Sequence, residues 1–146
     1  NNLSALIEDY HQHYANTQFI TELGRYIVGE CGVYIARIVD KKVSRGKTFI
    51  ITNGCLNHNL SSADYNFRIG QKNNYPASIA NKIGTQTEAA SVVGPLCTPL
   101  DVLAYESELP IAEIGDYFVM FQSGAYGYSS SPLDFLSHPK PLQYLV

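Results

Sequence analysis

The first residues of the chain carry apolar side chains three and four positions apart. This spacing brings the side chains to one face of an α-helix, which turns once every 3.6 residues. We therefore expect an amphipathic helix over residues 3–14, with an apolar face that needs a partner surface. The face consists of Leu3, Leu6, Ile7, Tyr10 and Tyr14.

Short runs rich in Val, Ile and Tyr follow, separated by clusters of Gly, Asn, Ser and Pro. Runs of this composition are typical of β-strands and their turns. A first run, at residues 18–22, should end in a tight turn at Gly24. Most runs lie after about residue 33, so the pattern predicts a mainly β chain. The expected strands there cover residues 33–39, 48–52, 77–80, 89–93, 102–105, 116–121 and 142–146.

Polar segments separate several of these runs. The stretch 41–47 lies between two expected strands, so we expect it to form a hairpin-like connection. The stretch 57–74 is rich in Asn, Ser, Gly and Asp, and it is the best candidate for a long, mobile loop. A loop rich in Gly, Tyr and Ser is expected over residues 123–131.

Composition places the chain among ordinary globular domains. Its 146 residues are 45% hydrophobic, which is enough for one domain with its own core. Ten Lys and Arg against thirteen Asp and Glu give a net charge of −3, without a basic run or stripe. The charge therefore gives no support for binding to nucleic acid or to an anionic membrane, and favours neutral small molecules or proteins as partners.

Three cysteines, Cys31, Cys55 and Cys97, show no CxxC spacing. An odd number of thiols without that spacing favours reduced cysteines in a cytoplasm over a disulfide framework or a zinc site. His11 and His13 do not share a helical face, so no metal site is predicted. No apolar run approaches the roughly 20 residues of a membrane span. The chain opens without a signal-peptide pattern or an initiator methionine, so we expect a piece of a longer, cytoplasmic protein.

Cys97 stands between two prolines, in the stretch Gly94-Pro95-Leu96-Cys97-Thr98-Pro99-Leu100-Asp101. Proline fixes φ and donates no hydrogen bond, so Pro95 and Pro99 exclude a regular helix or a central strand. The cysteine is therefore expected on a stiff loop, followed by a carboxylate. These residues alone leave two interpretations open, a structural thiol in a tight turn and a reactive group in an active-site loop.

Three short stretches carry a resemblance to a known family. They are Glu22-Leu23-Gly24-Arg25, Gly94-Pro95-Leu96-Cys97 with Asp101, and Ser123-Gly124-Ala125-Tyr126-Gly127. In this order they resemble the signatures of the pyridoxal-phosphate-dependent ornithine, diaminopimelate and arginine decarboxylases, which share the alanine-racemase-like fold. The resemblance covers roughly the last third of such an enzyme.

The resemblance implies two parts of the chain. Residues 33–146 would form the C-terminal β domain, which is a β-sandwich or β-barrel-like fold. Residues 1–32 would be the last helix and strand of a TIM-like barrel that binds the cofactor and carries the Schiff-base lysine upstream. No lysine in this chain stands in that context, so we expect the piece alone to be inactive.

Roles for individual residues follow from the same resemblance. Glu22 would pair with the pyridine nitrogen of pyridoxal phosphate and keep it protonated. Gly24 would donate its backbone N–H to the cofactor phosphate, and Arg25 would offer its guanidinium to the same group. Tyr126 would hydrogen-bond the phosphate, with its flanking glycines letting the loop come close.

Cys97 would be the catalytic acid in this family. It would protonate the carbon left when CO₂ departs. In the family this cysteine reaches the site from the partner subunit of a homodimer. We therefore expect its thiol near the surface of the isolated domain.

Two departures from the family pattern bear on the substrate. Enzymes that act on free diamino acids carry Asp or Glu after the cysteine, whereas this chain has Thr98, which offers no charge to a distal amino group. Diaminopimelate enzymes also place an Arg-Pro pair shortly after Gly54, and this chain lacks it. Thr98 is therefore a candidate substrate-binding residue. Asp101 either faces the substrate or holds the loop.

The variant at Thr98 resembles the subgroup that decarboxylates an aminoacyl group on an acyl carrier protein. Our leading hypothesis is a decarboxylase of a glutamyl-like group on such a carrier, because an uncharged distal pocket suits a substrate that continues into a tether. Two alternatives stay open. One is the same chemistry on free diaminopimelate, ornithine or a related amino acid, and the other is a non-catalytic homologue used for protein interaction.

Overall fold

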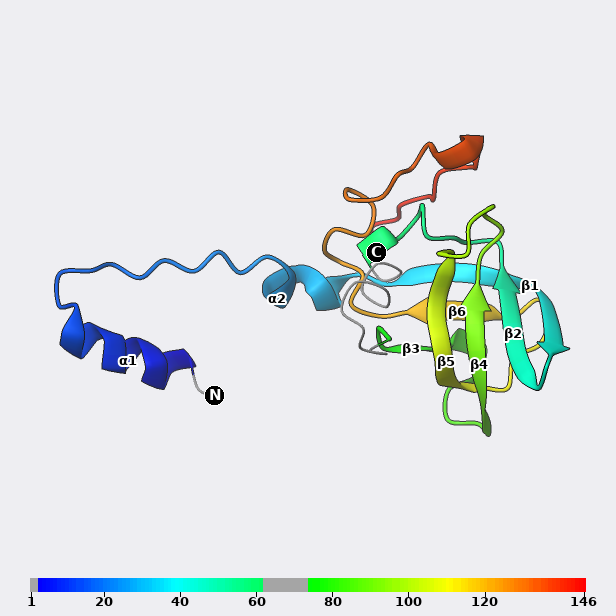
Figure 1. The fold of residues 1–146 in the computed structure, drawn as a ribbon, viewed down its shortest axis with the longest axis horizontal. Coiled ribbons are helices and arrows are strands. Elements are labelled where there is room, and N and C mark those ends of the chain that lie inside the picture. Colours follow the sequence, from blue (N-terminus) through cyan, green and yellow to red (C-terminus); the bar gives the residue numbers. More distant parts are fainter. Residues whose placement is uncertain (1–2, 62–73) are drawn as a thin grey trace.

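The computed structural model describes residues 3–61 and 74–146. Within these residues one sheet of six strands dominates (Figure 1), with the strand order β3-β6-β1-β2-β4-β5. The strands are β1 (Tyr34–Ser44), β2 (Lys47–Thr52), β3 (Ala77–Ile79), β4 (Thr87–Val93), β5 (Val102–Pro110) and β6 (Tyr117–Met120). The helices are α1 (Leu3–His13) and α2 (Arg25–Val28), with the 3₁₀ turns Gly29–Cys31, Ala80–Lys82 and Phe135–Ser137.

The sheet curls until its two edge strands meet. Neighbouring strands pair antiparallel except β2 and β4, which run parallel. The edge strands β3 and β5 pack against each other, so the sheet is a nearly closed barrel. The predicted mainly β, barrel-like fold is therefore confirmed.

The core fills the inside of the curled sheet, and every strand contributes to it. Its large side chains have almost no exposed surface, and burying each of them contributes roughly 1.5–3 kcal/mol. The largest are Ile38, Ile50, Ile79, Val92, Leu103, Leu109, Phe118 and Met120.

The connection predicted over residues 41–47 is much shorter in the structure. Strand β1 continues to Ser44, and Ser44 pairs directly with Lys47. The turn consists of Arg45 and Gly46, which both have positive φ, at 51° and 74°. Two successive residues with positive φ give the turn a twist that matches the strands, so both strands extend to the turn.

Two expected strands do not form. Residues 18–22 are extended but have no neighbouring strand among the described residues, and residues 142–146 also lack strand structure. A β-strand exists only when a neighbour takes up its backbone hydrogen bonds. The strand-like composition of these segments was therefore not sufficient to form a strand.

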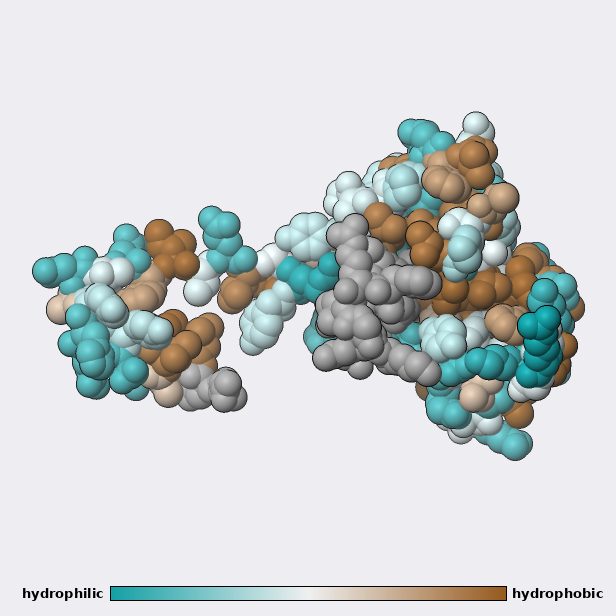
Figure 2. Space-filling view, in the orientation of Figure 1, coloured by the Kyte–Doolittle hydropathy of each residue, from teal (hydrophilic) through white to brown (hydrophobic). Residues whose placement is uncertain are grey.

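Helix α1 forms where the spacing predicts it, but it contacts no core. Its apolar residues are exposed, with Leu3 at 51% and Leu6 at 54%. Figure 2 shows them in brown beside hydrophilic residues, and Figure 1 shows the extended connection that leads from α1 to α2. No helix among the described residues is long and apolar enough to cross a membrane.

The predicted mobile loop over residues 57–74 is only partly described. Asn57 and Asn59 are fully buried, so the beginning of this stretch is packed, contrary to the prediction. The amide of Asn59 donates to the hydroxyl of Ser123 at 3.1 Å. The Oδ1 of Asn57 accepts the Cys55 thiol at 2.6 Å, while its buried amide nitrogen has no partner among the described residues. Polar composition alone indicated a solvated loop, whereas both side chains are buried inside the fold. Residues 62–73 lie outside the described residues.

Candidate active site

Two glycines bring the loop after β6 against α2. A Cβ on Gly32 would lie 2.7 Å from the Cα of Gly124, so the two backbones touch. The Ser123 N–H donates to the Gly32 carbonyl at 2.9 Å, and the Gly124 N–H donates to the Gly29 carbonyl at 3.0 Å. Only residues without a Cβ can approach this closely. The contact brings Tyr126, two residues further along, to the start of α2.

Tyr126 lies against Gly24 and Arg25. A Cβ on Gly24 would collide with the Tyr126 hydroxyl, so the tip of the ring rests on the Gly24 backbone. The guanidinium carbon of Arg25 lies 5.4 Å from the centre of the Tyr126 ring, which is within cation–π distance. The φ of Tyr126 is 62°, a conformation that costs free energy in a bulky residue and is frequent at ligand sites.

Arg25 is half-buried between two aromatic rings. The second ring belongs to Tyr75, whose centre lies 5.5 Å from the guanidinium carbon. The Nη1 atom of Arg25 is buried and has no acceptor among the described residues. Leaving a buried donor unpaired costs roughly 1–3 kcal/mol, so this position suits an anion. We call Gly24, Arg25, Tyr75 and Tyr126 the anion cradle.

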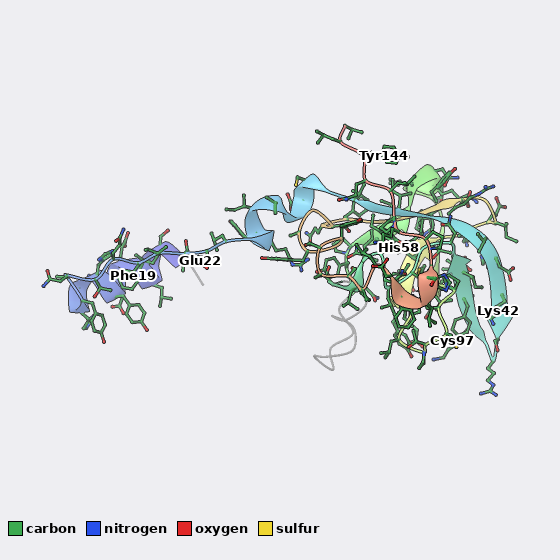
Figure 3. All side chains as sticks on the ribbon, turned by 90° about the horizontal axis from the view of Figure 1, so that it is seen from above. Phe19, Glu22, Lys42, His58, Cys97 and Tyr144 are labelled. Carbon is green, nitrogen blue, oxygen red and sulfur yellow. The ribbon has the colours of Figure 1, made fainter. Side chains whose placement is uncertain are left out.

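Glu22 is exposed on the segment that joins α1 to α2 (Figure 3). It precedes Gly24 by two residues, and the cradle does not include it. The structure therefore brings together three of the four predicted cofactor residues, Gly24, Arg25 and Tyr126.

Cys97 is exposed, in an irregular loop between β4 and β5. The loop is held by short-range hydrogen bonds, from the Thr98 N–H to the Leu96 carbonyl at 2.8 Å and from the Asp101 N–H to the Thr98 carbonyl at 3.3 Å. The Thr98 hydroxyl accepts the Leu100 N–H at 3.2 Å. Its own proton can still be donated to a ligand.

Asp101 joins this loop to the loop after β2. Its carboxylate is buried and accepts the Leu56 N–H at 2.7 Å and the Leu96 N–H at 2.8 Å, one at each oxygen. Burial raises the pKa of Asp101, and the two amide hydrogen bonds act against that rise. A Cβ on Gly94 would collide with the carboxylate. Of the two roles left open for Asp101, this geometry favours holding the loop.

A small apolar cluster lies beneath the two loops. Cys55 and Leu56 from one loop and Leu96 from the other are buried together, with Leu60 and Phe135 packed against them. Leu96 is the residue before Cys97. The position of the cysteine therefore depends on contacts from three separate parts of the chain.

His58 ties the C-terminal segment to this cluster. Its Nε2 lies 2.7 Å from the Pro139 carbonyl, and its Nδ1 lies 3.1 Å from the Tyr34 hydroxyl. A carbonyl can only accept, so Nε2 carries a proton in this contact, and the Tyr34 hydroxyl can donate to Nδ1 in the tautomer that leaves Nδ1 bare. The Tyr34 hydroxyl in turn accepts the Cys55 N–H at 3.1 Å. Burial raises the pKa of Tyr34 well above its usual range, so this hydroxyl stays protonated.

The anion cradle and the cysteine loop are separate in the chain. The cradle combines α2 with the loop after β6, whereas Cys97 follows β4. Figure 1 shows α2 and the loop after β4 in separate parts of the molecule, and Figure 3 shows Cys97 far from Glu22, which precedes α2. One copy of this chain therefore presents two separate candidate half-sites.

Comparison with known proteins identifies the family. A model described as the C-terminal sheet domain of pyridoxal-dependent decarboxylases matches residues 25–124. The chain belongs to this decarboxylase family. The match includes the cysteine loop and ends just before Tyr126, so it spans most of the curled sheet.

Two curated decarboxylases are similar over most of the chain. The L-glutamyl-[BtrI acyl-carrier protein] decarboxylase of Niallia circulans is 34% identical, over 98% of this chain and 35% of its own length. The 2-[(L-alanin-3-ylcarbamoyl)methyl]-2-hydroxybutanedioate decarboxylase of Staphylococcus aureus is 33% identical, over 82% of this chain and 31% of its own length. The chain thus spans about a third of the decarboxylases that it matches.

A solved structure shares the fold over almost the whole chain. The crystal structure of an Aquifex aeolicus protein superposes with a TM-score of 0.82 at 26% identity, and it covers 99% of this chain and 34% of that one. The agreement extends over α1 and the extended connection as well as the sheet.

The residues of the anion cradle fit one end of the family's cofactor. Pyridoxal phosphate carries a dianionic phosphate, and the buried Nη1 of Arg25 is a donor without an acceptor among the described residues. The space that a Cβ on Gly24 would fill holds the Tyr126 hydroxyl, which can donate a second hydrogen bond to an anion. These observations concern the phosphate end, since Glu22 stands outside the cradle.

Sequence reasoning missed several residues of these half-sites. Tyr75 follows the polar stretch 57–74 and stands in no motif, so nothing in the sequence linked it to Arg25. His58 and Tyr34 are 24 positions apart, and their contact arises only when β1 packs beside the loop after β2. Hydrogen-bonding residues of this kind have no fixed spacing, and the one available signal was the cluster of polar residues after Gly54.

Replacing Asp101 by Asn should loosen the cysteine loop. The variant puts an amide NH₂ opposite a backbone N–H, so one buried hydrogen bond is lost, and the free energy of unfolding should fall by about 2–3 kcal/mol. Amide hydrogen exchange should accelerate at Leu56 and Leu96. Asp134→Asn is the control, because its carboxylate is 84% exposed and should change stability little. Unchanged hydrogen exchange at the Leu56 and Leu96 amides would contradict the role of Asp101 in holding the two loops together.

The three thiols should differ sharply in their reaction with iodoacetamide. Near neutral pH, Cys31 and Cys97 should be alkylated, and Cys55 should not, because burial and the neighbouring Asp101 charge raise its pKa to about 11. Mass spectrometry of the separate peptides, at a series of alkaline pH values, measures the order in which the three thiols react. Cys55 holds its proton more tightly when folded, so its stabilising contribution is complete below its ordinary pKa of 9.0 and is lost as pH rises towards 11. Alkylation of Cys55 near neutral pH would contradict its buried position.

Proposed function

We propose that this chain is the C-terminal third of a pyridoxal-phosphate-dependent decarboxylase acting on an aminoacyl group carried by an acyl carrier protein. Residues 1–32 would be the last helix and strand of the cofactor-binding barrel, and residues 33–146 the β domain. The observation that carries the proposal is the buried, unpaired Nη1 of Arg25 in the anion cradle.

The cradle would hold the cofactor by its phosphate. Arg25 would donate to a phosphate oxygen from Nη1, and Tyr126 would donate its hydroxyl from the other side of Gly24. The tight packing of Tyr126 on Gly24 fixes both donors in advance, so little order is lost on binding. Glu22 would hold a proton at the pyridine nitrogen once the barrel orders its segment. The bound cofactor supplies an electron sink for the bond that releases CO₂.

Cys97 would act on the partner's cofactor in a homodimer. Its thiol would give a proton to the substrate carbon that has lost the carboxyl group. Two features support this role, the exposure of Cys97 and its separation from the cradle of its own chain. Asp101 would be a positioning residue that fixes the loop through Leu96.

Thr98 supports a substrate without a charged distal amino group. Its hydroxyl can donate one hydrogen bond, and it carries no charge, so a basic side chain would find no counter-ion at this position. The similarity to the carrier-protein decarboxylase favours a tethered glutamyl group. The similarity to the Staphylococcus aureus enzyme makes an untethered polar carboxylic acid the second candidate.

Removing the charge of Arg25 should weaken cofactor binding in the full-length protein. Arg25→Met loses a charge-assisted hydrogen bond worth roughly 1.5–3 kcal/mol, so the cofactor dissociation constant should rise about 10- to 100-fold. Equilibrium dialysis followed by cofactor absorbance measures the change without substrate. Arg37→Met is the control, because Arg37 is exposed on β1, away from the cradle. Equal affinity of both variants would remove the basis for the cradle.

The reaction itself is tested by CO₂ release from the full-length protein. Carrier-loaded glutamate should be turned over, whereas free diaminopimelate and ornithine should not. Cys97→Ala should lower the yield of the protonated product by about 100-fold or more, as expected for loss of a general acid, while cofactor binding stays intact. Turnover of a free amino acid alone would overturn the tethered substrate. The non-catalytic alternative would be favoured if no substrate were turned over and if Cys97→Ala bound its partner proteins as the wild type does.

A further inference from the structure

The β1–β2 hairpin gathers positive charge on a chain that is acidic as a whole. Residues 41–47 hold four of the ten basic residues and no acidic one, a short basic run that the prediction from overall charge overlooked, whereas the whole chain has a net charge of −3. The four are Lys41, Lys42, Arg45 and Lys47. Because β1 continues to the two-residue turn, the structure places all four within one compact hairpin rather than along a loose connection.

Two of the four cations are neutralised by the sheet. Lys41 contacts Glu88 of β4 at 2.5 Å and also donates to the Ala112 carbonyl at 3.0 Å. Lys47 contacts Glu106 of β5 at 2.5 Å. These pairs anchor the hairpin to the strands beside it, so its direction is fixed.

The other two cations are directed to solvent. Lys42 and Arg45 have no acidic partner among the described residues. Val43 lies between them in the sequence and is 71% exposed, but its side chain points to the opposite face of β1 from that of Lys42, because neighbouring strand residues alternate. Figure 3 shows Lys42 at the outer edge of the hairpin. Two unpaired cations at the end of the hairpin complement a surface that presents carboxylates.

The hairpin lies at the far end of the sheet from Cys97. Strand β2 begins at the hairpin turn and runs parallel to β4, and the loop that follows β4 carries Cys97. The six residues of β2 span about 20 Å at roughly 3.3 Å per residue. Figure 1 shows the turn and the loop after β4 at opposite ends of these two strands. A substrate on a flexible tether needs this separation, because its carrier docks a tether length from the reacting group.

We propose that Lys42 and Arg45 form the docking surface for an acidic carrier protein that delivers the tethered substrate. This inference rests on the proposed function, since it assigns a surface to the carrier. The complementary charge would accelerate the encounter and align the tether with the far end of the sheet. A lysine on an open strand edge can also serve only to prevent edge-to-edge pairing, and the experiment separates the two roles.

The test compares two substrates in the full-length enzyme. One is the aminoacyl group on its carrier protein, and the other is the same group on free pantetheine, which has the tether and no protein. The double variant Lys42→Glu with Arg45→Asp should lower kcat/KM for the carrier substrate by about tenfold or more, as expected when steering charges are reversed. Asp is chosen at position 45 because it tolerates positive φ. The value for the pantetheine substrate should stay unchanged.

Lys140→Glu is the matched control for Lys42→Glu, because it makes the same charge change on a side chain that is 51% exposed in the C-terminal segment. It should leave kcat/KM for both substrates unchanged. Added salt should lower the wild-type value for the carrier substrate and affect the double variant less.

Each outcome has a distinct meaning. An equal loss of kcat/KM for the carrier substrate in Lys140→Glu and in Lys42→Glu would overturn the docking surface while the proposed function stands. No loss of kcat/KM in the double variant would do the same. Equal loss on both substrates would show that the hairpin acts on the site and not on docking, and would also overturn it. Absence of turnover on either substrate in the wild type would instead refute the proposed function.

Discussion

The parallel pairing of β2 with β4 is the constraint on which the rest of the structure depends. All other hydrogen-bonded neighbours in the described sheet pair antiparallel, so only here do two strands that pair with each other end at the same edge. Their loops therefore leave the sheet side by side. The Asp101 carboxylate can then accept one N–H from each loop, and the stiff stretch between Pro95 and Pro99 acquires a fixed place above a small apolar cluster.

The link that Asp101 makes between the two loops is strong because its carboxylate is buried. A carboxylate removed from water is costly unless its oxygens are hydrogen-bonded, and here both oxygens have backbone partners. Arg25 differs from Asp101, because its buried Nη1 has no acceptor among the described residues. The carboxylate of Asp101 thus completes the fold, and the unpaired Nη1 of Arg25 is the observation on which the proposed phosphate site rests.

The two half-sites have different physical origins. The anion cradle exists because Gly32 and Gly124 let two backbones touch, which brings Tyr126 to Gly24. The cysteine loop exists because two prolines and one carboxylate fix its path. Each part is held rigidly by its own chain, and exposure of Cys97 leaves the thiol accessible to a second molecule. This arrangement supports the proposed active site shared between subunits.

The sequence by itself determined the mainly β fold, the helix at residues 3–13, most strand positions and the residues that carry the family resemblance. These features depend on side-chain periodicity and on local backbone limits at Pro and Gly, both of which are written in consecutive residues. It failed at residues 18–22 and 142–146, because a strand also needs a neighbour. Only the tertiary structure decided that Asp101 holds two loops, that Tyr75 joins Arg25, and that His58 links Tyr34 to Pro139. These contacts join residues far apart in the chain, and their partners are selected by how the sheet curls, which no local pattern records.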